Sequence, residues 1–210
     1  MAEKGRKMQH DQLLIRAIRQ HCAARNWFGV DLRGPEWDTS VVEDDRRKTG
    51  FIFPPATKNQ LWETEALLGF SLPPTLRSLY TEIANGGFGP AYGIRGAVGG
   101  FADATGTVVE DYQGRTESRS LLDLDLEAEL AQGEGEVVVP FDQWPRMLIS
   151  ICEWGCAIQI CLDCTTGRVF RVEPSRMGYH ITREAASLEE WLKKWMRDEL
   201  YSQPEHFQEV

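Results

Sequence analysis

The sequence predicts a single α+β domain in which a mostly antiparallel central sheet is flanked by helices. Helical patterns with recognisable ends occupy much of residues 11–85, and short apolar runs separated by turn residues follow between residues 147 and 182. A final helical pattern covers residues 188–200. The chain has 210 residues with 42% hydrophobic content, so it can bury one sizeable core.

The first predicted helix covers about residues 11–25. Its apolar face holds Leu14, Ala17, Ile18, His21 and Cys22. Residues 27–45 follow as a connection without a clear pattern. We therefore expect residues 1–49 to form a helix and a connection that pack on the domain.

The second predicted helix begins at Thr57, because Thr57 and Gln60 have the spacing of a capping box. It ends at Gly69, since glycine readily adopts the left-handed conformation that stops a helix. Three apolar side chains are assigned to its buried face: Leu61, Trp62 and Leu68.

The third predicted helix begins at Pro73 and Pro74, because proline fits the first turn of a helix, where its missing N–H costs nothing. The run Asn85-Gly86-Gly87 allows the positive φ angles that end it. Its apolar stripe has the spacing i, i+3, i+4, i+7 and consists of Leu76, Leu79, Tyr80 and Ile83.

The middle of the chain is less clearly patterned. Residues 88–112 are rich in glycine with scattered aromatic residues, which predicts loops and short strands. Residues 120–131 (SLLDLDLEAELA) alternate like a strand, yet they are good helix formers behind a cap from Ser120 to Asp123. The pattern alone leaves both structures open for this segment.

The later apolar runs predict an antiparallel sheet. Residues 147–152 and 156–162 are expected to form strands joined by a tight Glu153-Trp154-Gly155 connection, and residues 169–172 form the next strand. Three antiparallel strands are the simplest arrangement, and residues 179–182 are a further strand candidate.

The last predicted helix begins with the capping-box spacing of Ser187 and Glu190. Residues 203–210 are expected to form a loose tail. The helix has a broad apolar face made of Leu188, Trp191, Leu192, Trp195 and Met196.

The segment LLGFSLPPTLRSLYTEIANGGFGP, residues 67–90, resembles the signature of the SUKH superfamily, the Smi/Knr-type fungal cell-wall regulators and bacterial toxin-immunity proteins. The resemblance implies a SUKH-like domain at residues 50–202, and it favours a helix at residues 120–131. Further segments resemble family motifs, and together they extend the resemblance over roughly residues 50–200: 53–57, 63–70, 144–145, 151–158, 163–171 and 188–200.

The resemblance implies a non-enzymatic protein-binding domain, in one of two roles. The first is an immunity protein that binds and neutralises a cognate toxin, and the second is an intracellular scaffold or regulator of Smi/Knr type. Members of the superfamily differ in what they bind, so the resemblance is more specific about fold than about function.

One segment carries nearly all of the net charge of −9, because residues 101–140 contain ten Asp or Glu and only two Arg. Such a segment would repel nucleic acid and anionic lipid and would attract a basic partner, such as a nuclease-type toxin. A solubilising surface explains the same pattern. The acidic residues predicted to bind the partner are Asp123, Asp125, Glu127 and Glu129.

Two tryptophans lie at strand ends or turns with a carboxylate next to them in the sequence, and such a pair can anchor an Arg or Lys of a partner. The alternative is that they close the end of the sheet against a loop. The residues predicted for this anchor are Asp142, Trp144, Glu153 and Trp154, with Asn85, Phe88 and Tyr92 as neighbours of the same surface.

Cys152, Cys156, Cys161 and Cys164 offer the weak alternative of a metal-dependent enzyme with a zinc site. In an extended strand, Cys156 and Cys161 would face opposite sides roughly 16 Å apart, whereas Zn–S bonds are about 2.3 Å long. Five cysteines without a secretion signal also favour reduced thiols. We therefore expect structural cysteines, no metal and no cofactor.

Several function classes find no support in the sequence. It contains no phosphate-binding loop, nucleophile elbow or His-Glu-x-x-His motif. No apolar run approaches the ~20 residues of a membrane helix, and no signal-peptide core is present. We expect a cytoplasmic protein that is not an enzyme, that binds neither nucleic acid nor membranes, and that is monomeric when free.

Overall fold

The computed structural model describes residues 2–25, 51, 53–133 and 135–200. The main sheet is antiparallel throughout. Its strands follow the order β2 (Glu136–Val139), β7 (Tyr179–Ala185), β6 (Val169–Pro174), β5 (Ile158–Asp163) and β4 (Leu148–Gly155). A small parallel pair, β1 (Ser120–Leu122) and β3 (Gln143–Pro145), forms a second sheet.

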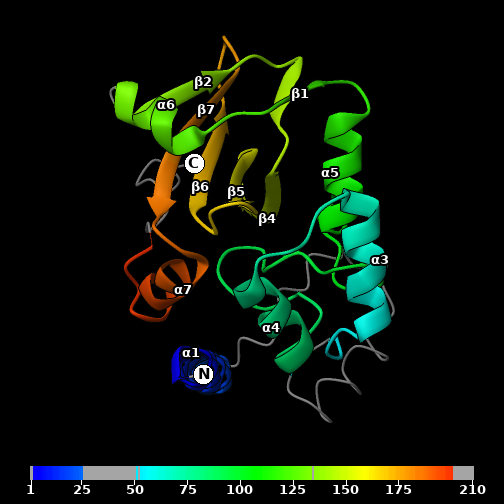
Figure 1. The fold of residues 1–210 in the computed structure, drawn as a ribbon, viewed down its shortest axis with the longest axis vertical. Helices are drawn as coiled ribbons and strands as arrows, with labels where there is room; N and C mark the ends of the chain where they lie inside the picture. The colour runs from blue at the N-terminus through cyan, green and yellow to red at the C-terminus, as the bar shows by residue number, and fades with distance from the viewer. Residues whose placement is uncertain (1, 26–50, 52, 134, 201–210) are drawn as a thin grey trace, which may run out of the picture.

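The helices lie around this sheet, as Figure 1 shows. They are α1 (Ala2–Arg25), α3 (Lys58–Leu68), α4 (Pro74–Glu82), α5 (Val108–Thr116), α6 (Leu126–Gln132) and α7 (Leu188–Met196). α1, α4 and α7 contact one another, α5 lies between α3 and β4, and α6 contacts β2. The α+β class predicted from the sequence is confirmed. No helix in the described ranges combines the length and apolarity needed to cross a membrane.

Both predicted ends of α3 and the predicted start of α4 are confirmed, whereas α4 ends at Glu82, before the predicted stop at Asn85-Gly86-Gly87. The Thr57 hydroxyl oxygen accepts a hydrogen bond from the Gln60 backbone N–H, and the Gln60 side-chain oxygen accepts one from the Thr57 backbone N–H. These two bonds form the capping box at the start of α3. Gly69 ends α3 in the left-handed conformation. Pro74 opens α4, and the whole predicted stripe is buried: Leu76, Leu79, Tyr80 and Ile83.

The predicted apolar faces of the first and last helices also lie in the core. α7 is capped by the Ser187 side chain and buries Leu188, Trp191, Leu192 and Trp195. α1 begins earlier than predicted, at Ala2, and buries Leu14, Ile15, Ile18 and Cys22. The predicted connection at 27–45 and the tail at 203–210 lie outside the described residues, and the domain boundaries stay predictions.

The placement of Trp62 in the core was wrong, because its side chain is 73% exposed. α3 buries Leu61, Thr64 and Leu68 instead. Trp62 follows Leu61 directly, and a step of one residue turns a side chain by about 100° around a helix, away from the buried stripe.

Two predictions for the middle of the chain need correction. Residues 88–112 contain the start of α5, which a capping box between Thr107 and Glu110 opens. Residues 120–131 are not one helix, because Ser120–Leu122 pairs with Gln143–Pro145 and the helix begins only after Asp125. Strand pairing between segments distant in the sequence decided against the continuous helix.

The sheet is larger than the three strands expected, since β2 and β7 extend it. The predicted turn at residues 153–155 is also displaced, because β4 continues through Gly155 and the turn lies at Cys156 and Ala157. Both turn residues have positive φ, 52° and 62°, as in the type I′ turns that match the twist of a hairpin. Neither is Gly or Asn, so the sequence carries no turn signal there.

Candidate functional site

A buried ionic network lies between the loop after α4, helix α5 and strands β4 and β5. Arg95 is its centre, and its side chain is fully buried. Its Nε donates a hydrogen bond to Asp103 Oδ2 at 2.5 Å, and its Nη1 lies 3.4 Å from Asp111 Oδ1. Both carboxylates are almost fully buried, so the buried guanidinium is balanced by two buried anions.

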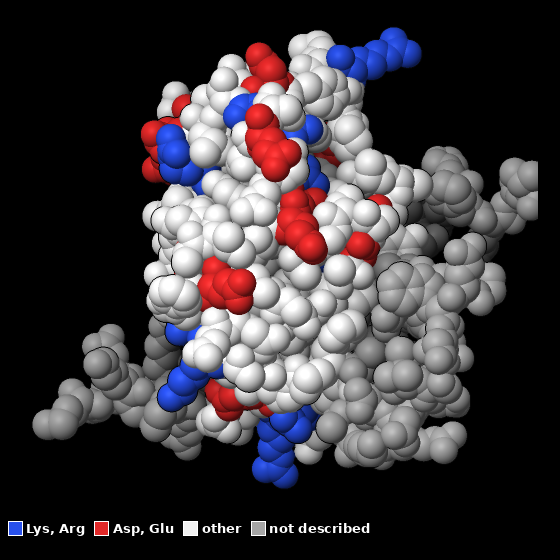
Figure 2. All heavy atoms as spheres, turned by 90° about the vertical axis from the view of Figure 1, so that its right-hand side faces the viewer, with Lys and Arg blue, Asp and Glu red and all other residues white. Residues whose placement is uncertain are grey.

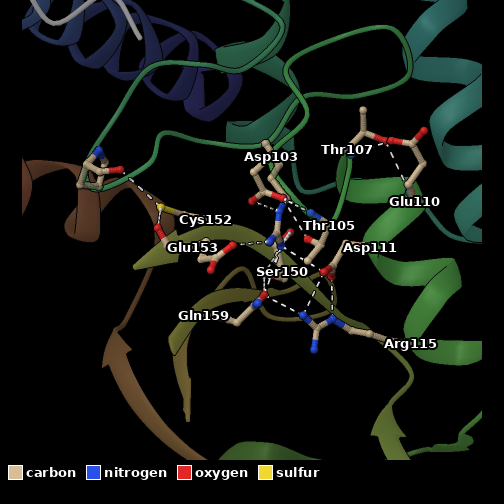
Figure 3. A network of polar contacts seen from close by, with 12 residues as sticks. Asp103, Thr105, Thr107, Glu110, Asp111, Arg115, Ser150, Cys152, Glu153 and Gln159 are labelled. Carbon is tan, nitrogen blue, oxygen red and sulfur yellow. Dashed lines mark hydrogen bonds and ion pairs between the residues drawn. The ribbon is translucent and has the colours of Figure 1, made fainter. Parts of the chain in front are cut away.

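Arg115 and Gln159 extend the network toward the sheet (Figure 3). Arg115 binds Asp111 with two hydrogen bonds, of 2.7 and 2.9 Å, and donates a third to Gln159 Oε1 at 2.7 Å. Gln159 Oε1 also accepts hydrogen bonds from Arg95 and the Ser150 hydroxyl. Because α5, β4 and β5 all contribute to these bonds, the network joins the helix layer rigidly to the sheet.

Glu153 lies at the rim of this network. Its Oε2 is 3.9 Å from Arg95 Nη2, and its side chain is 22% exposed. Arg95 Nη2 has no hydrogen-bond partner among the described residues. Burial raises the pKa of Glu153, and the nearby charge of Asp103 raises it further, while Arg95 acts in the opposite direction. The rim therefore holds a partly exposed carboxyl group whose protonated form is favoured mainly by burial.

Two aromatic residues adjoin Glu153 along the backbone, namely Tyr92, which is bonded to it, and Trp154, which follows it on β4. The Tyr92 backbone N–H donates to the Glu153 carbonyl at 3.4 Å, and the Tyr92 hydroxyl passes beside Gly155. Both aromatic side chains are half-buried. We call Tyr92, Glu153 and Trp154 the aromatic–acid cluster, which unites three of the residues that the sequence predicted for partner binding.

Other residues of that prediction are buried inside the domain. The Asn85 side chain is bonded to the backbone of Ala97 and Val98, and Phe88 is fully buried in the core. Trp144 is also fully buried, where its Nε1 donates to the Leu148 carbonyl at 2.8 Å. These three side chains have internal partners and reach no surface, so they hold the fold and cannot contact a partner directly.

The acidic residues after β1 have internal partners to differing degrees. Asp123 forms an exposed ion pair with Arg146 at 2.6 Å. Glu127 lies 3.1 Å from Arg183 and 3.5 Å from Arg168, and Asp125 caps α6 through the N–H groups of residues 127 and 128. Glu129 and Asp142 are exposed, and no ion pair involves them within the described ranges. Of the five acidic residues in this paragraph, only Glu129 and Asp142 form neither an ion pair nor a helix cap within the described ranges.

The excess negative charge is therefore not one continuous acidic surface. Asp103 and Asp111 are buried against arginines, and Glu127 is shared between two more. On the face over α3 and α5, acidic side chains form separate groups with uncharged surface between them and basic side chains near several of them (Figure 2).

The cysteines do not converge on one point. Cys152 and Cys161 are buried, Cys164 is half-buried and Cys156 is exposed. Burial raises the pKa of Cys152 and of Cys161 to about 12, which keeps both thiols protonated. Among the described residues, no group of three or more His, Cys, Asp or Glu is arranged to hold a metal ion.

The sequence reasoning missed Arg95, Asp111, Arg115 and Gln159 as an interacting set. A faint signal existed, because Arg95 is a lone cation in the uncharged run from Phe88 to Phe101, which suggests burial with a counter-ion. Its partners come from the same loop, from α5 and from strands β4 and β5, and sequence spacing does not show that they meet.

Comparison with protein families gives one match. The model of the SMI1 / KNR4 family (SUKH-1) matches residues 55–194, which is more than half of the chain. The match includes α3, α4, the ionic network and the whole main sheet. A comparison with curated proteins found no significant match.

Proposed function

Because the chain belongs to the SMI1/KNR4 family (SUKH-1), we propose that it is a cytoplasmic, non-enzymatic domain that binds another protein, and specifically an immunity protein that neutralises a basic, nuclease-type toxin. The observation that carries the proposal is the aromatic–acid cluster, in which the Glu153 backbone is bonded to Tyr92 and followed on β4 by Trp154, while the Glu153 carboxyl group is partly exposed. An Arg or Lys side chain of the toxin would lie against an aromatic ring and beside this carboxylate.

The ionic network supports this role because it holds the cluster in place. β4 carries Glu153 and Trp154, and it is bonded through Ser150 and Arg95 to α5. Side chains on a rigid support lose little conformational entropy on binding, which increases affinity. Exposed carboxylates elsewhere on the surface, such as Glu129 and Asp142, would add long-range attraction for a basic partner.

The test is binding between the full chain and the toxin domain encoded beside its gene, measured by co-purification and by calorimetry. We expect a complex whose association slows as salt rises. Trp154→Ala should weaken binding about 30-fold, the loss typical of an interface hot spot of about 2 kcal/mol. The matched control is Trp62→Ala, which removes an exposed tryptophan from α3 and should leave binding unchanged.

The electrostatic attraction between the chain and a basic partner is tested with separate variants. Glu129→Lys combined with Asp142→Lys should slow association without affecting folding, because neither carboxylate has an ion pair within the described ranges. Glu63→Lys on α3 is the control for a charge reversal elsewhere on the surface, to be compared with Glu129→Lys alone. If neither salt nor these variants change the association rate, electrostatic attraction is excluded. If no complex forms at all, the immunity role is excluded.

One observation favours the alternative of an intracellular scaffold or regulator of Smi/Knr type. Several carboxylates of the acidic segment are paired inside the chain, as Asp111 and Glu127 are, so part of the acidic excess serves the fold. A chain captured from its native lysate with a non-toxin protein, through a surface that includes Trp154, would support this alternative.

A further inference from the structure

The buried ionic network does not balance its own charge within the part of the chain that the structure describes. It contains three carboxyl groups, those of Asp103, Asp111 and Glu153, against the two guanidinium groups of Arg95 and Arg115. Gln159, the partner of Glu153 across the β4–β5 ladder, is neutral. With every group ionised, the network therefore lacks one positive charge.

The excess negative charge falls on Glu153, the carboxyl group of the network that reaches the surface. Asp103 and Asp111 are almost fully buried, and each accepts hydrogen bonds from a guanidinium group. In the view of Figure 3, Glu153 and Asp111 approach the network from opposite sides. Because Glu153 is partly exposed, a cation from outside can supply the missing charge at this side chain.

The Arg95 guanidinium group has a donor nitrogen that lacks an acceptor. Its Nη2 is buried without a hydrogen-bond partner among the described residues, and Glu153 Oε2 faces it at 3.9 Å, beyond hydrogen-bond distance. An ionised carboxylate has about four lone-pair sites, so it can accept from Nη2 and from a second donor together. The vacant donor thus favours an ionised Glu153 that bridges Arg95 and a second cationic group.

A proton supplies the missing charge in the free chain over part of the pH range. Burial raises the pKa of Glu153, the carboxylates of Asp103 and Asp111 raise it further, and the two guanidinium groups act in the opposite direction. The free chain therefore keeps a proton on Glu153 at pH values where an exposed glutamate has already lost it.

We propose that Glu153 binds an Arg or Lys side chain of the partner protein in exchange for its own proton, so that the partner's cation completes the charge balance of the network. The O–H bond of the Glu153 carboxyl group breaks and the proton passes to solvent. The carboxylate then accepts hydrogen bonds from the partner's cationic group and from Arg95 Nη2. That the cation belongs to a basic partner rests on the proposed function, whereas the charge deficit of the network does not.

An anion does not fit the same position. It would accept a hydrogen bond from Arg95 Nη2, but it would add a negative charge beside Glu153 and Asp103 in a network that already has one in excess. A neutral amide could bond to both Arg95 and Glu153, yet it would leave the charge deficit in place. A cationic group is the occupant that removes the deficit.

The exchange makes binding depend on pH in a defined direction. Below the pKa of Glu153 in the free chain, the partner must displace a bound proton, so each further unit of pH decrease weakens binding by up to about tenfold. Above that pKa the carboxylate is already ionised, and this contribution to the pH dependence disappears. Arg and Lys of the partner stay charged throughout, because their pKa values lie above about 10.

The test follows the side-chain carboxyl carbon of Glu153 by NMR in the full chain with isotope-labelled glutamate, titrated from about pH 4 to 8. The probe is a capped Ala-Arg-Ala peptide, and the matched control is the same peptide with citrulline, which has the shape of arginine without its charge. At saturation the arginine peptide should lower the titration midpoint of Glu153 by at least about one pH unit, a tenfold preference for the ionised form. The citrulline peptide should leave the midpoint unchanged.

Variants of the protein identify the signals. The Glu153 signal is the one that Glu153→Gln lacks, and Glu153→Asp replaces that variant if urea unfolding shows that it does not fold. The exposed Glu63 on α3, identified in the same way with Glu63→Gln, is the internal control, and its midpoint should not change with either peptide. An unchanged Glu153 midpoint with the arginine peptide would overturn the proposal, and so would an equal decrease with the citrulline peptide.

The outcomes separate this proposal from the proposed function. Binding of the toxin domain should weaken as pH falls, and Glu153→Gln should remove the part of this dependence that Glu153 causes. If the toxin complex forms and depends on Trp154 but is unaffected by pH and by Glu153→Gln, proton exchange fails while the immunity role stands. If the arginine peptide lowers the Glu153 midpoint but no toxin complex forms, proton exchange stands and the immunity role fails.

Discussion

At the scale of single residues, Arg95 has the largest consequence for stability. Its guanidinium meets Asp103, Asp111, Ser150 and Gln159 without access to water. A buried ion pair is costly to form, but removing one member is worse, because the other charge remains buried without a partner.

We predict that Arg95→Met lowers the free energy of unfolding by about 3–5 kcal/mol, measured by urea denaturation, because Asp103 and Asp111 lose their buried counter-ion. The control is Arg146→Met, which breaks the exposed pair with Asp123 and should cost less than about 1 kcal/mol. Similar losses for the two variants would contradict the assignment of Arg95 as the centre of the network.

Glu153 makes stability depend on pH. Its pKa in the folded state lies above the ordinary value of 4.5, mainly because of burial, so between the two values the folded state binds more protons than the unfolded state. Stability therefore falls as pH rises through this window and is constant above it. Burial raises the pKa of Glu184 as well, which adds a decline of the same sign.

We predict that Glu153→Gln removes its part of this decline. The variant should gain stability relative to the natural chain as pH rises from about 4 to 7, since glutamine carries no charge to bury. Denaturation curves across this range measure the difference, with Glu63→Gln as the exposed control. A constant difference between Glu153→Gln and the natural chain over the whole range would be inconsistent with the raised pKa.

At the scale of elements, two glycines that follow adjacent helices, Gly69 as the C-cap of α3 and Gly86 in the loop after α4, have the same φ of +82° but different surroundings. A Cβ on Gly69, after α3, would meet nothing within 4 Å. A Cβ on Gly86, after α4, would lie 2.6 Å from the Gly96 nitrogen and 2.7 Å from the Ile94 carbonyl oxygen. Gly86 is thus required both for its backbone angle and for the close approach of the loop that carries Arg95.

We predict that Gly69→Ala costs about 1–2 kcal/mol of unfolding free energy, the cost of a left-handed alanine. Gly86→Ala should cost at least about 3 kcal/mol, because backbone atoms must also move. The comparison by thermal or urea unfolding isolates the steric part, since the φ strain is common to both variants. If the two variants lose the same unfolding free energy, the loop around Ile94 can move to accommodate a Cβ on Gly86 at no measurable cost.

Elements differ in how much their own sequence reveals. α3 and α7 have side-chain caps, α4 has a proline start, and all three have apolar stripes within a few residues, so local pattern predicts them. β1 and β2 are three and four residues long and owe their existence to pairing with β3 and β7. Such pairing depends on contacts between distant parts of the chain, which no local window contains.

At the scale of the whole molecule, the acidic side chains behind the net charge of −9 fall into a buried group and an exposed group. Part of the acidic segment turns inward, where Asp103 and Asp111 neutralise arginines, and part remains outside, as Glu129 does. The aromatic–acid cluster was predicted in part, because Trp154 and Glu153 are neighbours in the sequence, while Tyr92 joins them only through the fold. Trp144 was predicted for the same surface but lies in the core.

The sequence by itself determined the starts of α3, α4 and α7, most of their apolar stripes and the superfamily, because these depend on residues close together along the chain. Only the tertiary structure decided which carboxylates are buried, which aromatic residues are exposed and in which order the strands pair. The physical reason is that burial and strand pairing are set by segments far apart in sequence, such as Arg95 with Gln159 and β2 with β7. Residue types show what a side chain could do, and the fold decides whether it reaches the surface.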